Sequence, residues 1–203
     1  MHISDGVLPT TVTVATAFVA LAGVAWSYKQ VKNEDLPKIA VVTSSFFVAS
    51  LVHLPFGPTS VHLILPGIVG ALLGPAAFLS IALGLFLQSI LFQFGGLTAL
   101  GANTLMMGLP AFLCGLLFQR IRGKTALSHG IAGVICGGLG TAFAATVLAC
   151  LLVTAGEDFF GVAKLALIAH VPVFLIEAGV SAFAISFLFR VKPELLDAWG
   201  KTR

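Results

Sequence analysis

The sequence contains little charge. Asp, Glu, Lys and Arg make up only 9% of its 203 residues, against roughly 25% in a soluble globular domain. Hydrophobic residues make up 58%, and the mean hydropathy is +1.07. Because the few charges stand between long apolar runs, this composition excludes an ordinary soluble domain and indicates a polytopic membrane protein. The net charge of +3 then reflects topology rather than affinity for nucleic acid.

Basic residues are absent from the first nine positions (MHISDGVLP), and the apolar run that follows them is long. A cleavable signal peptide has a basic start and an apolar stretch of only about 7–15 residues before its cleavage site. We therefore expect the amino-terminal segment to be retained, with Met1 as its first residue.

Several reactive motifs are also lacking. Cys114, Cys136 and Cys150 stand singly in apolar stretches, which excludes a disulfide framework and is typical of buried packing residues. The Gly-Lys-Thr at 123–125 imitates the end of a phosphate-binding loop, but Phe118 occupies the position of a required glycine. His-Glu-x-x-His is absent as well. We therefore expect no nucleotide site and no enzyme activity in this chain.

Apolar segments of about 20 residues predict membrane-spanning helices. We expect an all-α polytopic membrane protein of about seven such helices, in one domain over residues 1–195, with a short cytoplasmic tail over 196–203. The approximate spans are 9–27, 37–54, 60–74, 75–94, 102–119, 126–153 and 161–189. The third and fourth are joined only by Gly74-Pro75, so the third could instead be a kinked or half-buried segment.

The basic residues predict the orientation, because they gather in cytoplasmic loops. With the amino terminus outside, the loops predicted on the outer side (55–59, 95–101 and 154–160) contain no Lys or Arg, and only Lys164 lies towards that side. The residues then placed inside are Lys29, Lys32, Lys38, Arg120, Arg122, Lys124, Arg190, Lys192, Lys201 and Arg203. We expect the amino terminus outside and the carboxyl terminus inside.

The first two residues form a candidate metal chelate. The α-amine of Met1 and the amide nitrogen of His2 can close a five-membered ring around an ion. The same amide nitrogen and Nδ1 of His2 can close a six-membered ring. One further imidazole would complete a square of four nitrogens, the geometry that Ni(II) and Cu(II) prefer.

Histidines supply the candidates for that fourth nitrogen. His2, His53 and His62 are all predicted at the outer end, whereas His129 begins a span at the inner side and His170 lies inside the last span. His62 could complete the chelate or simply cap a helix end. His53 could be a reserve ligand, but a structural role or one in orienting the ligands fits it better.

Three polar residues could support such a site. Ser60 could hydrogen-bond and orient the ring of His62, as groups around metal ligands do. Asp5 could neutralise or orient the bound ion, or it could cap the first helix ahead of Pro9. Asn103 could hydrogen-bond in the pocket or cap the helix that follows it.

Glu177 lies deep in the last span, where an ionisable group is costly and usually functional or paired. His170 is seven residues earlier on nearly the same helical face. The two could form a hydrogen-bonded structural pair, or part of a path for protons or ions. If they form such a path, an alternative function follows, namely a passive metal channel or a proton-coupled secondary metal carrier.

Four motifs together resemble the CbiM/NikM family, the substrate-binding membrane components of energy-coupling-factor transporters for cobalt and nickel. The resemblance covers residues 1 to about 195. The motifs are Met1-His2-Ile3 with Asp5-Gly6, Ser60-Val61-His62-Leu63, the loop FGGLTALGAN at 94–103, and His170-Val171-Pro172 leading to Glu177.

The resemblance implies that Met1, His2 and His62 hold Ni²⁺ or Co²⁺ as a transported ion, with no resident cofactor. It also implies partners that supply the energy: a transmembrane coupling protein and two ABC-type ATPase subunits, often with a small accessory membrane protein. The expected location is the cytoplasmic membrane of a prokaryote. Square-planar nitrogen ligation favours nickel, but low-spin Co(II) accepts the same ligands, so the sequence does not choose between them.

Overall fold

The chain is mainly helical. The computed structural model describes residues 2–51, 53–56, 59–197 and 199, and only the backbone of residues 53–56 and 59–61. Within these residues the helices are α1 (Thr10–Tyr28), α2 (Leu36–Leu51), α3 (Pro66–Leu73), α4 (Ala77–Phe92), α5 (Leu100–Ile121), α6 (Ala126–Val153) and α7 (Phe159–Val191). Short 3-10 turns occur at η1 (Asn33–Asp35), η2 (Gly74–Ala76) and η3 (Pro193–Leu196), and a two-stranded hairpin at β1 (His53–Phe56) and β2 (Thr59–His62).

Small residues set the centre of the bundle. The short helix α3 packs between α5 and α6, and all of its residues except Ile68 are buried. A Cβ on Gly67 would lie 2.5 Å from the backbone nitrogen of Gly137 in α6, and one on Gly70 would lie 2.1 Å from the carbonyl oxygen of Ala111 in α5. The three helices therefore approach closely enough for backbone contact, as small residues allow inside membranes.

Five helical segments of the described chain are long and apolar enough to cross a membrane, and one of them joins α3, η2 and α4. The other four are α1, α5, α6 and α7. The expected separate span over 60–74 is wrong. Residues 59–62 form a strand, and α3 has only 8 residues, about 12 Å of helix. The kinked alternative holds, because Pro66 opens α3 and the positive φ of Gly74 (49°) bends the chain before Pro75.

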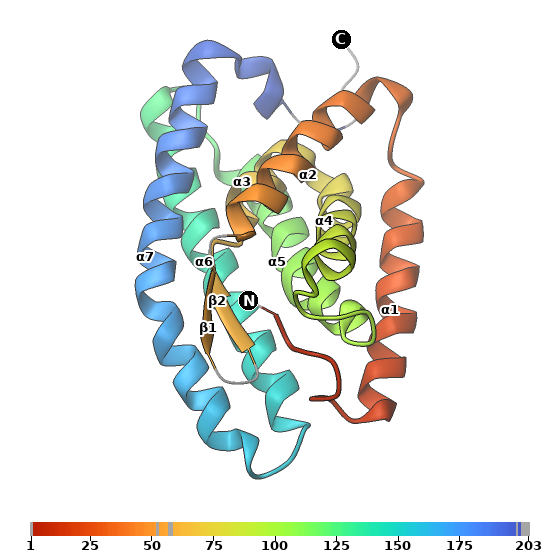
Figure 1. Cartoon of the computed structure of the whole chain (residues 1–203). Helices are drawn as coiled ribbons and strands as arrows, with labels where there is room; N and C mark the ends of the chain where they lie inside the picture. Colours follow the sequence, from red (N-terminus) through yellow and green to blue (C-terminus); the bar gives the residue numbers. More distant parts are fainter. Residues whose placement is uncertain (1, 52, 57–58, 198, 200–203) are drawn as a thin grey trace.

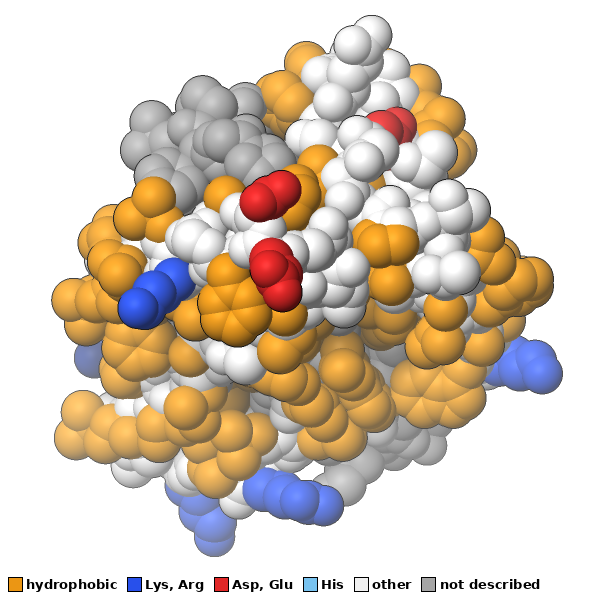
Figure 2. Space-filling model, turned by 90° about the horizontal axis from the view of Figure 1, so that it is seen from below, with side chains coloured by type: hydrophobic (Ala, Val, Ile, Leu, Met, Phe, Trp, Pro, Cys, Tyr) orange, Lys and Arg blue, Asp and Glu red, His pale blue; other side chains and the backbone are white. Residues whose placement is uncertain are grey.

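Five membrane-crossing segments do not confirm the expected count of about seven spans. The second expected span corresponds to α2, which has 16 residues. Orientation across the membrane stays a prediction. The outer surface of the bundle suits a bilayer, since large apolar side chains such as Phe18 (70% exposed) and Phe183 (76%) are exposed. In the end-on view of Figure 2, hydrophobic side chains line much of the rim of the molecule. The acidic side chains on that end of the molecule stand apart from the basic ones at its periphery.

A β-hairpin lies inside the bundle, and the sequence analysis did not predict it. β1 and β2 are antiparallel, with His53 opposite His62 in the register. The prolines at 55 and 58 prevent α2 from continuing into this stretch. The segment before α1 lies beside the hairpin, so both lie within a frame of helices (Figure 1).

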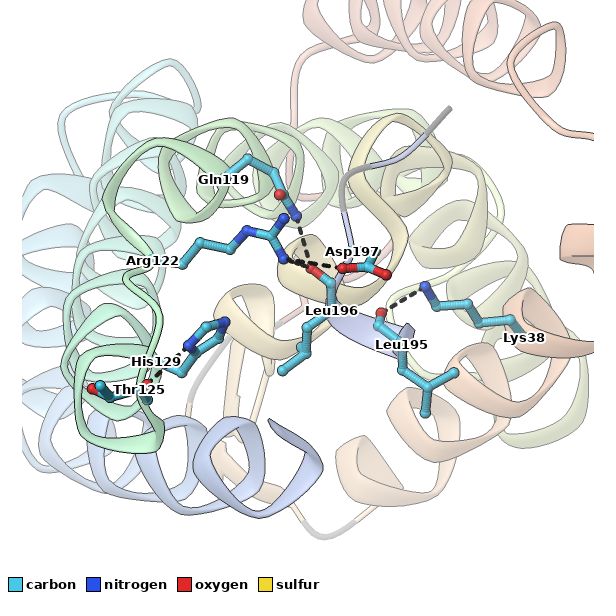
Figure 3. A network of polar contacts seen from close by, with 8 residues as sticks. All are labelled: Lys38, Gln119, Arg122, Thr125, His129, Leu195, Leu196 and Asp197. Atoms are coloured by element: carbon cyan, nitrogen blue, oxygen red, sulfur yellow. Dashed lines mark hydrogen bonds and ion pairs between the residues drawn. The ribbon is translucent and has the colours of Figure 1, made fainter. Parts of the chain in front are cut away.

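The end of the bundle away from the α6–α7 turn is covered by η3 (Figure 1). This 3-10 turn runs across the expected boundary between the domain and the tail, at residues 195 and 196. Lys38 Nζ donates to the carbonyl oxygen of Leu195 at 2.7 Å, and Arg122 donates to that of Leu196 (Figure 3). Arg122 also lies 4.0 Å from the carboxylate of Asp197. Leu196 is fully buried, so the start of the tail is packed into this end of the bundle.

Candidate metal centre

The imidazole rings of His2 and His62 lie together inside the bundle. Their centroids are 4.6 Å apart and the ring planes make an angle of 28°. Both side chains are buried, although they are separated by 59 residues and come from different segments. The structure therefore unites the two predicted imidazoles. Met1 lies outside the described residues, so its α-amine stays a predicted ligand.

The hydrogen bonding of His62 determines which ring nitrogen can bind an ion. Nδ1 lies 2.6 Å from the carbonyl oxygen of Leu63, and because a carbonyl can only accept, Nδ1 carries the proton. The lone pair is then on Nε2. This atom is buried and has no hydrogen-bond partner among the described residues. An imidazole oriented in this way, with one nitrogen tied to a carbonyl, is typical of metal ligands.

Asn103 in α5 holds the backbone beside His2. Its Oδ1 accepts from the amide of Ile3 at 2.8 Å, and its Nδ2 donates to the carbonyl of Ile3 at 3.0 Å. The side chain of Ile3 is fully buried against the core. Of the two roles expected for Asn103, the structure therefore shows the hydrogen-bonding role. The expected cap is wrong, because Asn103 lies inside α5, beyond its N-terminal residue Leu100.

Asp5 anchors the loop that leads into α5. Its Oδ1 accepts from the amide of Thr98 (2.9 Å), the hydroxyl of Thr98 (2.5 Å) and the amide of Ala99 (3.0 Å). Partial burial raises the pKa of this carboxyl, but these hydrogen bonds outweigh it and leave the pKa below its ordinary value. The expected cap on the first helix is wrong, since α1 begins only at Thr10 and Pro9 is its N-cap residue.

Two glycines let this loop close over the site. Gly95 and Gly96 have φ angles of 78° and 105°, which favour glycine. A Cβ on Gly95 would lie 2.8 Å from Nδ2 of Asn103 and 3.5 Å from the His2 ring, and one on Gly96 would lie 2.1 Å from Cγ of Asp5. We call residues 94–99 the lid loop, because this segment packs directly on the amino-terminal segment.

The other candidate residues lie apart from this pair or outside the description. The side chains of His53 and Ser60 are not among those described. His129 stacks on Phe189 with centroids 4.1 Å apart, and lies near the end that η3 covers (Figure 3). Over the described residues, no group of three or more His, Cys, Asp or Glu side chains could hold a metal.

The expected hydrogen-bonded pair of His170 and Glu177 is wrong. His170 Nδ1 donates to the carbonyl of Ala166 at 2.6 Å. Oε1 of Glu177 accepts from the amides of Ile64 and Leu65, the latter at 2.8 Å. Seven residues of helix separate the two side chains by about 10.5 Å along the axis, too far for a direct bond. Sequence analysis missed the tie from Glu177 to the chain after His62, because its partners are backbone amides.

Comparison with known proteins places these residues in a family. Residues 2–195 match the family model CbiM, described as the cobalt uptake substrate-specific transmembrane region. The chain is 37% identical over 203 residues to a candidate metal transport protein of Haemophilus influenzae, with 97% of each chain covered. It is 28% identical to the cobalt transport protein CbiM of Sorangium cellulosum, covering 97% of this chain and 95% of that one.

Solved structures have the same fold. A crystal structure of a transition metal transporter superposes with a TM-score of 0.75 at 23% identity, covering 94% of this chain and 93% of the other. A truncated transition metal transporter gives 0.74 at 24% identity, covering 94% and 99%.

Proposed function

The chain belongs to the CbiM family of cobalt-uptake substrate-specific transmembrane proteins, and from this premise we propose that it captures Ni²⁺ or Co²⁺ for an ATP-driven importer of the energy-coupling-factor type. It is thus a multi-pass membrane protein of cobalt or nickel transport. The proposed location is the cytoplasmic membrane of a prokaryote, with the amino terminus and the metal centre towards the outside.

The observation that carries this proposal is the buried contact between His2 and His62, in which Nε2 of His62 has its lone pair available and no partner among the described residues. In the proposed site the ion binds four nitrogens: the α-amine of Met1, the amide and Nδ1 of His2, and Nε2 of His62. Such a set suits Ni(II) and low-spin Co(II) alike. Selection between them then depends on the supply of metal or the fit of the pocket.

The surrounding residues support capture from one side. Asn103 fixes the backbone next to His2, and Asp5 fixes the lid loop across it. In our proposal an ion entering from outside displaces protons from the nitrogen ligands, and the closed lid loop then shields it from water. Release inward follows a rearrangement driven by ATP hydrolysis on partner subunits. The proposed partners are a coupling membrane protein and two ABC-type ATPases, with a small accessory membrane protein in some assemblies.

The test is to move the terminal amine without changing any side chain. Two residues, Gly-Ser, are added before Met1 of the purified full-length protein, and Ni²⁺ binding is measured by equilibrium dialysis with elemental analysis. Two residues are needed, because a single one would place His2 third and create a different chelate. We expect tight binding to be lost, while the same Gly-Ser added after Arg203 changes nothing. Unchanged binding by the amino-terminal variant would refute the chelate.

A further inference from the structure

Helix α7 carries three buried polar atoms that have no hydrogen-bond partner among the described residues: Nε2 of His170, Oε2 of Glu177 and Oγ of Ser181. Their spacing of seven and then four residues places them on one face of the helix. Glu177 and Ser181 are fully buried, and His170 is nearly so. Buried polar groups normally have hydrogen-bond partners. A row of three such groups without partners therefore points to a ligand.

This row of polar groups begins at the metal centre. Helix α7, which carries His170, packs against β2, the strand that ends at His62. Glu177 is tied through Oε1 to the amides of Ile64 and Leu65, which follow His62 directly. From His170 to Ser181 the helix advances about 16 Å, away from the end that holds the α6–α7 turn and towards the end covered by η3 (Figure 1).

Helix α6 packs against the inner part of this row of polar groups through a glycine. A Cβ on Gly137 of α6 would lie 2.5 Å from Oγ of Ser181 and 2.6 Å from the carbonyl oxygen of Glu177. Gly137 therefore brings the backbone of α6 against the hydroxyl of Ser181 and the backbone carbonyl of Glu177. Residues 177 and 181, four apart on a helix, are neighbours that a single ion can touch.

We propose that Oε2 of Glu177 and Oγ of Ser181 form a second, deeper site for a divalent cation, which receives the ion from the metal centre by way of Nε2 of His170. The identity of the ion rests on the proposed function. Carboxylate and hydroxyl oxygens bind Ni²⁺ and Co²⁺ more weakly than four nitrogens do, and one carboxylate neutralises only half of the ion's charge. The deeper site is therefore suited to passing an ion on rather than to retaining it.

The substitution Glu177→Gln separates this role from a purely structural one. The amide oxygen of Gln can still accept from Ile64 and Leu65, so the tie beside His62 is kept. The NH₂ group replaces the unpartnered oxygen and cannot bind a cation. Ser181→Ala removes the second proposed ligand without touching that tie. Ser186→Ala is the control, since it removes a hydroxyl of the same helix that already donates to the carbonyl of Ala126.

Binding of Ni²⁺ is measured on the purified full-length protein by equilibrium dialysis over a wide range of metal concentrations. We expect two ions per wild-type chain, one tight and one weak. Glu177→Gln and Ser181→Ala should each weaken only the second ion, by about tenfold or more, with Ser186→Ala unchanged. His62→Ala should lose the tight ion and keep the weak one.

A single ion in the wild type, or a second ion that all three α7 variants bind equally, would overturn the deeper site and leave the proposed function standing. Absence of the tight ion from the wild type would refute the proposed function instead. If Glu177→Gln does not fold, the comparison of Ser181→Ala with Ser186→Ala decides the matter by itself.

Discussion

Replacing Asn103 by alanine tests whether metal affinity depends on how firmly the amino-terminal segment is held. Asn103 is not itself an expected ligand, but Oδ1 and Nδ2 of its side chain both bond the backbone of Ile3. The change leaves the N–H and C=O of Ile3 without these partners in a buried place. We therefore expect the segment to leave its position in the metal-free protein, and the bound ion to bear the cost of ordering it again.

The size of the effect follows from the two lost bonds. A buried polar group left unsatisfied costs about 1–3 kcal/mol, and values near the lower end apply because a displaced segment regains contact with water. The two groups together then cost about 2–3 kcal/mol, which corresponds to Ni²⁺ binding about 30- to 150-fold weaker. Tight binding should become weaker, with its stoichiometry unchanged.

The assay pairs equilibrium dialysis with hydrogen exchange of the peptide that contains residues 2–9. Thr104→Ala is the matched control, because Thr104 is the next residue of α5, is equally buried, and lines the groove towards α1 and α4. In Asn103→Ala, exchange over 2–9 should rise and affinity should fall. Wild-type affinity together with faster exchange would show that the bonds from Asn103 to Ile3 are not needed for metal binding, which would refute this prediction.

Two further results are expected. Gly96→Ala should speed Ni²⁺ dissociation in a chelator chase, because the new Cβ would meet the carboxylate of Asp5 and displace the lid loop; Gly156→Ala, also at positive φ (121°) but with nothing within 4 Å, should dissociate like the wild type. Metal affinity should fall from about pH 8 to about pH 5.5, because the nitrogen ligands must lose protons to bind. Asp5 does not contribute to this fall: its pKa is lowered on folding, so its stabilising effect is present above its unfolded pKa of about 3.9 and is lost only as the pH falls further. A flat profile would count against nitrogen ligands.

The long helices could be predicted from the sequence, because an apolar run has one stable form in a membrane. The expected span 126–153 has the bounds of α6, and 102–119 and 161–189 lie within α5 and α7. The run from 60 to 74 is equally apolar, yet it begins as a strand and then forms a short helix. Hydropathy measures only how strongly a segment prefers lipid or protein to water. It therefore does not distinguish a segment enclosed by other helices from one that spans the membrane as a helix.

The errors at the site have a different cause. Asp5 stands where a cap of the first helix is expected, but its partners lie 93 and 94 residues away. His170 and Glu177 share a helical face, yet two turns keep them apart and each bonds a backbone group instead. Side-chain spacing reveals contacts along one element. Contacts from a side chain to a distant backbone leave no residue pattern, so only the folded chain shows them.

These anchoring contacts divide the site into rigid and movable parts. The expected ligands stand on the segment before α1 and at the end of β2, whereas two of the three anchoring side chains, Asn103 and Glu177, stand on long membrane helices. The third, Asp5, joins the amino-terminal segment to the lid loop. Breaking such a tie costs a few hydrogen bonds, whereas moving a ligand on a packed helix would disturb the core. The lid and the ligands can therefore separate while the bundle stays intact, as a protein that must first bind its ion and then release it requires.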